Sequence, residues 1–171
     1  MSRQLYLMRH AHAAPGGTLG DLYRPLDQLG RDQARRIGAA LADAGVEWVL
    51  TSPAARTRQT VAGLGLGAPV EVVPALYGGG CSVLIDRLRQ LDDDLQRVLL
   101  VGHNPDVAAA VQRLYDPADS DPTAVGLIQT HFPTATCCQL EFDQPWSELS
   151  SARLRRSLRS KPPRSPADDR R

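Results

Sequence analysis

Short apolar runs alternate with amphipathic stretches over most of the chain. The continuous runs Leu5–Met8 and Val98–Val101 are typical of strands that are buried on both faces. Shorter runs at 47–51 and 70–73 predict two more strands, and the alternation over 135–142 predicts a fifth. Longer segments of mixed polarity separate these strands, which is the pattern of an α/β protein.

Apolar residues recur at helical spacing between the strands, and local start and stop signals bound each helix. The predicted helices span 26–44, 52–64, from 81 or 82 to about 95, and 106–114. Ser52 is expected to cap the second helix, with Pro53 as its first residue. Residues 116–126, rich in proline and aspartate, predict a loop. The fold class is therefore α/β: a three-layer α/β/α sandwich with a mostly parallel central sheet and helices on both faces.

The length of 171 residues favours one domain with a single sizeable core. Its 42% hydrophobic content and mean hydropathy of −0.28 indicate a soluble globular protein. No run approaches the roughly 18 apolar residues of a membrane span. Arg9 interrupts the apolar run near the N-terminus, so we expect no signal peptide. Three cysteines make no disulfide framework, and we expect a cytoplasmic protein.

The charge is unevenly distributed along the chain. Residues 1–150 carry 12 arginines against 17 acidic residues, whereas 151–171 carry seven arginines and one lysine against two aspartates. We therefore predict a domain over 1–149 and a basic Arg/Ser/Pro-rich tail over 150–171, in which Leu154 and Leu158 could form a short helix before a disordered end. A solvated end is favoured over a nucleic-acid-binding arm, so nucleic acid is not an expected partner.

Polar motifs follow three of the predicted strands. Arg9 and His10 follow the first, Ser52 and Arg56 follow the second, and His103 follows Val98–Val101. Because the carboxyl ends of parallel strands open on one edge of a sheet, we expect these motifs to converge. The planar guanidinium of arginine suits phosphate, and a neutral imidazole is a nucleophile. Arg56 also lies in the first turn of a helix, where free N–H groups favour an anion. The pattern predicts covalent chemistry on a phosphoryl group.

The motifs LMRHAHA, TSPAARTRQT and VGHNP, together with RPLDQLG at 24–30, resemble the histidine phosphatase superfamily, also called phosphoglycerate mutase-like. The resemblance covers roughly residues 3–142, and the short length and VGHNP are similar to the small SixA-type phosphohistidine phosphatases. It implies a phosphoglycerate mutase-like fold and a metal-independent hydrolase without a cofactor. It makes His10 the nucleophile that accepts the phosphoryl group. The residues that would bind the phosphoryl oxygens are Arg9, Arg56 and, as an imidazolium, His103.

The chain departs from the family pattern at three places. Ala11 stands where the family usually has glycine, and Asp27 stands where it has a threonine cap. Phosphomonoesterases of the family resemble one another in carrying a carboxylate after the third strand. The corresponding loop of this chain, 76–80, has none. An alkoxide leaving group needs such a general acid, whereas imidazole, with a pKa near 6.5, needs far less help. We therefore predict phosphohistidine on a partner protein as the substrate, with small phosphorylated molecules as the alternative.

Three polar residues near these motifs have two interpretations each. Asn104 is expected either to orient a phosphoryl oxygen or to cap the helix that follows it. Arg24 would either line the rim of the site or pair with Asp21. His12 would either touch the substrate or lie on the rim facing solvent. All three are weaker candidates for substrate binding than the residues of the motifs.

Other functions compete with that of a phosphohistidine phosphatase. A metal hydrolase would use His10, His12 and His103 as ligands, but Arg9 and Arg56 would repel the cation. A non-catalytic phosphate-binding module would use the same pocket, although a pure binder needs no nucleophile. A broader small-molecule phosphomonoesterase of the same family would need an acid, and so would a mutase. The sequence does not identify the partner protein, and no membrane partner is expected.

Overall fold

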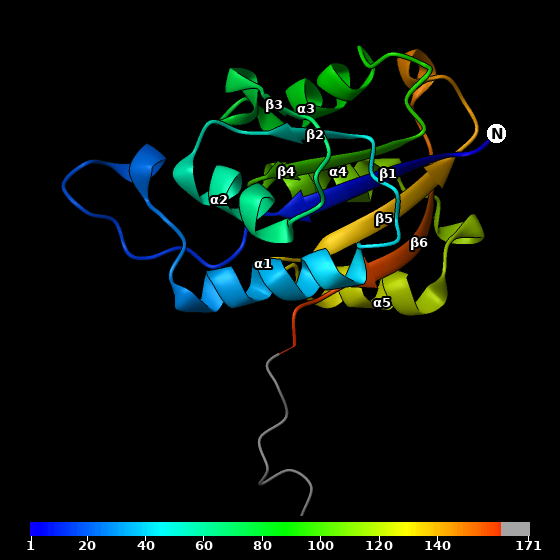
Figure 1. Ribbon diagram of the computed structural model, residues 1–171. Coiled ribbons are helices and arrows are strands. Elements are labelled where there is room, and N and C mark those ends of the chain that lie inside the picture. Colours follow the sequence, from blue (N-terminus) through cyan, green and yellow to red (C-terminus); the bar gives the residue numbers. More distant parts are fainter. Residues whose placement is uncertain (162–171) are drawn as a thin grey trace, which may run out of the picture.

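The fold is built on one six-stranded sheet (Figure 1). The computed structural model describes residues 1–161. The strands are β1 (Arg3–Arg9), β2 (Trp48–Thr51), β3 (Val70–Val72), β4 (Arg97–Gly102), β5 (Cys137–Phe142) and β6 (Arg153–Leu158). They lie in the order β3-β2-β4-β1-β5-β6. The first four strands of that order are parallel, and β5 and β6 run antiparallel to their neighbours. The prediction of a mostly parallel sheet is confirmed.

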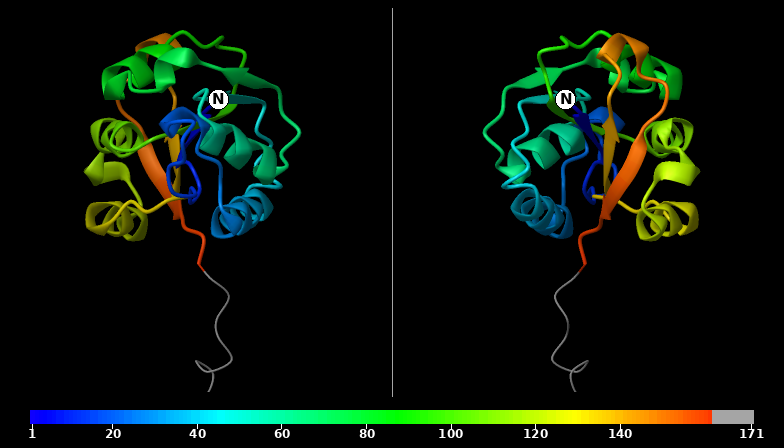
Figure 2. Two further views of the ribbon diagram at one scale, coloured as in Figure 1. Left: turned by 90° about the vertical axis from the view of Figure 1, so that its left-hand side faces the viewer. Right: turned by 90° about the vertical axis from the view of Figure 1, so that its right-hand side faces the viewer.

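Helices cover both faces of the sheet, as Figure 2 shows with the sheet seen nearly edge-on. They are α1 (Gln28–Ala40), α2 (Ala55–Leu64), α3 (Gly80–Leu88), α4 (Asp106–Leu114) and α5 (Pro122–Thr130). Helices α1 and α2 pack on one face, and α3, α4 and α5 pack on the other. The three-layer prediction is therefore confirmed. None of the helices in residues 1–161 has the length and apolar character needed to cross a membrane.

The two central strands owe their position to continuous apolar sequence. Val98–Val101 of β4 is fully buried, and Leu5–Met8 of β1 is almost fully buried. Alternate residues of each strand enter opposite faces, so that Leu99 packs toward α1 and Leu100 packs toward α3 and α4. Buried strands of this kind require a helical layer on each side. Their polar carboxyl ends are consequently held rigidly at one edge of the sheet.

Helices α1 and α2 approach each other closely at Gly38. A Cβ atom built on Gly38 would lie 2.2 Å from the carbonyl oxygen of Leu64. We expect Gly38→Ala to lower the free energy of unfolding by about 1–3 kcal/mol, the usual cost of overpacking. Gly126 in α5 is the matched control, because a Cβ there meets nothing within 4 Å. Gly126→Ala should stabilise the protein by roughly 1 kcal/mol. Chemical denaturation checks both, and equal effects at the two sites would contradict the account.

Two expected elements differ from the structure in the last third of the chain. Residues 116–126 are not a loop, because α5 and a short 3-10 helix, Pro117–Asp119, occupy most of the segment. Proline is favoured in the first turn of a helix, and the side chain of Asp121 caps α5 by accepting from the N–H of Ala124 at 2.8 Å. The third helix is also shorter than expected and ends at Leu88. The proline and aspartate of residues 116–126 therefore mark the start of α5 and not a loop.

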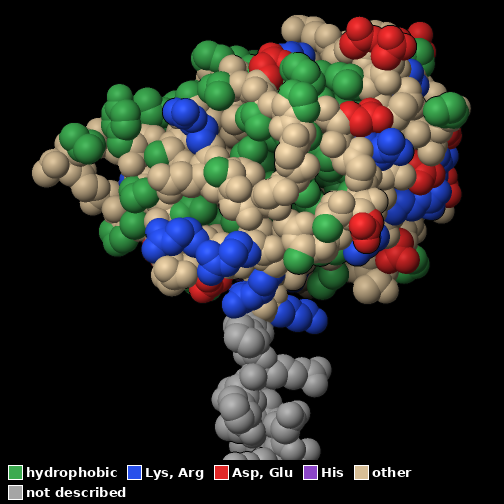
Figure 3. Space-filling model, in the orientation of Figure 1, with side chains coloured by type: hydrophobic (Ala, Val, Ile, Leu, Met, Phe, Trp, Pro, Cys, Tyr) green, Lys and Arg blue, Asp and Glu red, His purple; other side chains and the backbone are tan. Residues whose placement is uncertain are grey.

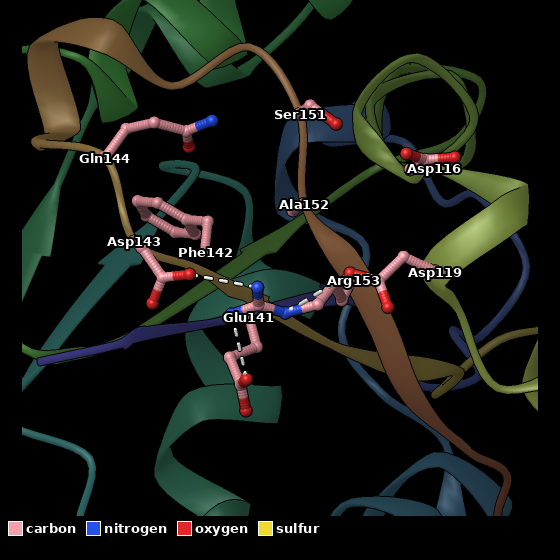
Figure 4. Close-up of a pocket in the computed structure, with 9 residues that line it drawn as sticks. All are labelled: Asp116, Asp119, Glu141, Phe142, Asp143, Gln144, Ser151, Ala152 and Arg153. Atoms are coloured by element: carbon pink, nitrogen blue, oxygen red, sulfur yellow. Dashed lines mark hydrogen bonds and ion pairs between the residues drawn. The ribbon is translucent and has the colours of Figure 1, made fainter.

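The expected tail contributes a strand to the sheet. Residues 153–158, taken as a possible helix, form β6 along β5, so the domain boundary at 149/150 is wrong. Arg153 anchors this edge by ion pairs of 3.0 Å to Glu141 and 2.9 Å to Asp143 (Figure 4). It lines a cavity of about 150 Å³. The expectation of a disordered end falls, over 162–171, outside the described residues.

Candidate active site

The three predicted motifs meet at the carboxyl ends of β1, β4 and β2, which are adjacent in the sheet. Arg9 ends β1, and the N–H of His10 donates to the carbonyl of Gly102 at the end of β4 at 2.9 Å. The ring centroids of His10 and His103 are 5.3 Å apart. The N–H of Ser52, just after β2, lies 3.4 Å from the carbonyl of Val101. The expected convergence of the strand ends is therefore present.

His10 has the geometry of a nucleophile. Its Nδ1 lies 2.7 Å from the carbonyl oxygen of Ala11, and a carbonyl can only accept, so Nδ1 carries the proton and Nε2 keeps its lone pair. The side chain is 7% exposed. Burial above all, with the positive charges of Arg56 and Arg9, lowers the pKa of His10 to about 4. The imidazole is therefore neutral at physiological pH.

Two guanidinium groups, that of the half-buried Arg9 and that of the buried Arg56, bring positive charge close to His10. Arg9 donates from Nη1 to the carbonyl of Phe132 at 3.1 Å. Arg56, 6% exposed, donates from Nη1 to the backbone carbonyl of Asp21 at 2.8 Å and from Nη2 to its carboxylate at 3.0 Å. The Nε atom of each arginine is buried with no hydrogen-bond partner among residues 1–161. Both groups bring fixed positive charge close to His10, which favours an anion there.

His103 is held by a serine rather than by a charged group. Its Nε2 lies 2.7 Å from Oγ of Ser52, and its Nδ1 is buried without a partner in the described part of the chain. Burial above all, then the charge of Arg56, lowers the pKa of His103 to about 4. This low pKa favours a neutral His103 ring at neutral pH rather than the expected imidazolium. Ser52 also departs from expectation: the cap residue of α2 is Ala54, without a side-chain cap, and the helix begins at Ala55.

The low pKa values give a pH prediction. We expect the imidazoles of His10 and His103 to titrate near pH 4 in the substrate-free protein, and NMR titration of their ring carbons checks this. The unfolded pKa is about 6.5. The folded state therefore binds fewer protons, and stability should fall as the pH decreases from about 6.5 toward 4. A midpoint near 6.5 for both rings would contradict the burial of the site.

The weaker candidates take structural positions. Asn104 donates from Nδ2 to the carbonyl of Phe132 at 3.1 Å and accepts at Oδ1 from the N–H of Ala108 at 3.2 Å, so its amide binds the first turn of α4, although the cap residue is Pro105. His12 pairs with Asp27 at 2.6 Å at the start of α1, and nearly half of its side chain is exposed. Among residues 1–161 no three histidine, cysteine or acidic residues group as a metal site requires. The three histidines of the metal-hydrolase alternative are therefore not arranged as ligands.

The departures from the family pattern are accommodated locally. Asp27 caps α1, accepting from the N–H of Gly30 at 2.8 Å, as predicted. Ala11 is fully buried, and its N–H donates to Oγ1 of Thr60 at 3.0 Å. Within the described residues Ala135 is the only non-glycine residue with positive φ, so Ala11 needs no glycine conformation.

Sequence reasoning missed the role of Asp21 at this site. Its Oδ2 accepts from Nη2 of Arg56 and, at 2.7 Å, from the hydroxyl of Tyr77, and its Oδ1 lies 3.1 Å from Nε of Arg24. Arg24 thus pairs with Asp21, which was one of its two expected roles. The ring of Tyr77 also meets the ring of His103 edge-on at 5.6 Å. The i,i+3 spacing of Asp21 and Arg24 is the sequence signal for their ion pair. It gives no indication of the contact between Asp21 and Arg56.

Comparison with known proteins agrees with this geometry. Residues 5–77 match the histidine phosphatase superfamily (branch 1). A putative phosphohistidine phosphatase SixA of Nakamurella multipartitia, known from its solved structure, is 34% identical, with a TM-score of 0.83 over 92% of this chain and 96% of that one. The chain belongs to the histidine phosphatase superfamily and is a phosphatase.

Further relatives indicate which branch of the superfamily the chain resembles. The protein histidine phosphatase SixA complexed with tungstate is 27% identical, with a TM-score of 0.73 over 91% of this chain and 96% of that chain. The uncharacterised protein Rv1276c of Mycobacterium tuberculosis is 31% identical over 144 residues, which are 83% of this chain and 91% of that protein. Within the superfamily the chain thus resembles the SixA-type branch.

Proposed function

We propose that this phosphatase removes the phosphoryl group from phosphohistidine on a partner protein through a covalent phosphohistidine at His10. The observation that carries the proposal is the convergence of a neutral His10 imidazole with the ring of His103, 5.3 Å away, and with the positive charges of Arg9 and Arg56. A tetrahedral oxyanion is the kind of ligand that two guanidinium groups close together favour. The SixA relative complexed with tungstate, itself an oxyanion, supports the same reading.

The reaction has two displacements. In the first, Nε2 of His10 attacks phosphorus, the bond from phosphorus to the substrate nitrogen breaks, and the electron pair leaves on the substrate imidazole. In the second, water attacks phosphorus, the bond to His10 breaks, and inorganic phosphate forms. Transfer of this kind needs positioning and charge neutralisation at the equatorial oxygens, which Arg9 and Arg56 supply. His103 donates from Nδ1 when the hydroxyl of Ser52 donates to its Nε2.

The leaving group supports phosphohistidine over a phosphate ester. The segment after β3 carries Tyr77 and no carboxyl group between residues 76 and 80. Asp21 is the carboxylate beside the site, and the hydrogen bond from Tyr77 above all, with that from Arg56, lowers its pKa. It is ionised at neutral pH and does not protonate an alkoxide. Imidazole, with a pKa near 6.5, leaves without such help.

The cellular setting is part of the proposal. Cys137 and Cys138 are adjacent, buried and unpaired, and Cys81 is also a free thiol. Free thiols are usual in a reducing compartment, which supports a cytoplasmic location. No residue that the mechanism uses requires a metal, so activity should persist after treatment with a chelator.

The test compares three substrates: a protein phosphorylated on histidine, a phosphoserine peptide and p-nitrophenyl phosphate. A missing general acid commonly costs on the order of 10²–10⁴ in rate, so we expect kcat/KM for the phosphohistidine protein to exceed that for the phosphoserine peptide by about 100-fold or more. Rapid turnover of the esters with no loss of phosphate from the phosphohistidine protein would overturn the proposal in favour of a broader phosphomonoesterase.

A further inference from the structure

Asp21 lies between the buried anion site and solvent. It begins the 3-10 helix Asp21–Tyr23 in the segment that joins β1 to α1. That segment projects at the left of Figure 1, and its surface in Figure 3 is mostly hydrophobic and uncharged. The side chain of Asp21 is 53% exposed, whereas that of its partner Arg56 is 7% exposed. The carboxylate therefore reaches the site from its open side.

The hydrogen bonds of Asp21 leave it capacity to accept more. Oδ2 accepts from Arg56 and Tyr77, while the contact of Oδ1 with Nε of Arg24 is an ion pair at 3.1 Å. An ionised carboxylate offers about four lone-pair positions. Because half of the side chain is exposed, a group arriving from solvent can occupy one of them. The carboxylate is an acceptor and a negative charge, and its ionised state excludes the role of proton donor.

The direction of the reaction brings the leaving group toward this carboxylate. In-line displacement puts the leaving group on the side of phosphorus opposite Nε2 of His10. His10 is 7% exposed, so the nucleophile attacks from the protein interior and the leaving group faces solvent. Asp21 and Tyr77 are both exposed and adjoin the site, through Arg56 and the ring of His103 respectively. A leaving group with a proton and a positive charge is attracted there, and one that becomes an anion is repelled.

We propose that Asp21 is a specificity-determining residue that favours leaving groups carrying an N–H and a positive charge over leaving groups that depart as anions. The assignment rests on the proposed function and names what selects its substrate. When the bond from phosphorus to nitrogen breaks, the electron pair stays on that nitrogen. The imidazole leaves neutral because its other nitrogen already carries a proton, and that proton stays hydrogen-bonded to Asp21.

The test is the ratio of kcat/KM for N-phosphoimidazole, whose protonated ring leaves as neutral imidazole, to kcat/KM for p-nitrophenyl phosphate, both measured at about pH 6. Asp21→Asn keeps an oxygen that can accept from Arg56 and removes the charge. Loss of a charge-assisted hydrogen bond should lower the ratio about 10- to 100-fold. The matched variant Asp21→Glu keeps the charge and should retain most of the ratio.

The outcomes separate selection from positioning. If Asp21 only holds Arg56 in place, Asp21→Asn lowers both values of kcat/KM equally and leaves the ratio unchanged, which would overturn the proposal. Because N-phosphoimidazole needs no partner protein, the ratio also tests the inference separately from the proposed function. If the ratio falls in Asp21→Asn but the parent protein does not hydrolyse the phosphohistidine protein, the proposed protein substrate is refuted and the role of Asp21 is supported.

Discussion

Replacement of His10 by alanine is expected to lower kcat/KM by at least about 10⁴-fold for every phosphorylated substrate, as loss of a covalent nucleophile does in other enzymes. His10 presents a free Nε2, whereas the Nε2 of the neighbouring His103 is engaged by Ser52. The release of inorganic phosphate measures the effect. A variant that retains more than about a tenth of the activity would mean that another group attacks phosphorus.

His12→Ala is the matched control for this variant. His12 lies two residues further along the chain, but its Nδ1 pairs with Asp27 and the side chain is about half exposed. We expect kcat/KM to stay within about threefold of the parent, because an exposed pair of this kind contributes little. A loss comparable with that of His10→Ala would bring His12 back into the reaction, where the structure does not place it.

Replacement of Arg56 by alanine has the second largest expected effect. Removal of one preorganised donor from a buried oxyanion site commonly costs about 10²–10³ in kcat. Arg56 is buried, and its positive charge acts on both His10 and His103, so the charge is held where the phosphoryl group would be transferred. The loss should fall mainly on kcat, because the charge on the equatorial oxygens matters most in the transition state.

Arg56→Lys separates charge from geometry in this prediction. Lysine keeps a positive charge but loses the planar fork that holds both the carbonyl and the carboxylate of Asp21. We expect the activity of Arg56→Lys to lie between that of the parent and that of Arg56→Ala. A melting temperature equal to that of the parent checks that the variant is folded. Parent-like kcat in Arg56→Ala would contradict the assignment of this guanidinium to the phosphoryl oxygens.

The central fold followed from local sequence because its signals were strong and mutually consistent. The runs Leu5–Met8 and Val98–Val101 are apolar on both faces, and the structure buries both. Helix α4 has the predicted bounds, and the predicted cap Asp27 immediately precedes α1. Each of these features is decided by residues within one turn or one strand, so no distant contact was needed to predict it.

The strand β6 shows where local reasoning fails. Its sequence from Arg153 to Leu158 contains three arginines, and charged residues are a common feature of edge strands. Nothing in that stretch indicates pairing with β5 or the ion pair of Arg153 with Glu141, because both come from the neighbouring strand. A basic composition was therefore read as a solvated tail, although this part of it completes the sheet.

Some features of the candidate site could likewise be predicted from the sequence and others could not. The placement of Arg9, His10 and His103 could be predicted because each follows a strand of one parallel sheet. The neutral state of His103 could not, since it depends on burial by residues distant in sequence. The contact of Asp21 with Arg56 joins a loop to a helix 35 positions away, and no periodicity reports such a contact.

The covalent role of His10 is tested most directly by the mass of the intact protein. The parent and His10→Ala are each mixed with a phosphohistidine protein and quenched without acid within one turnover. The mass of each intact protein is then measured by mass spectrometry. The account predicts that part of the parent gains the mass of one phosphoryl group, located on His10, and that His10→Ala gains none. An equal adduct on both proteins, or rapid phosphate release by the parent with no adduct at any quench time, would contradict it.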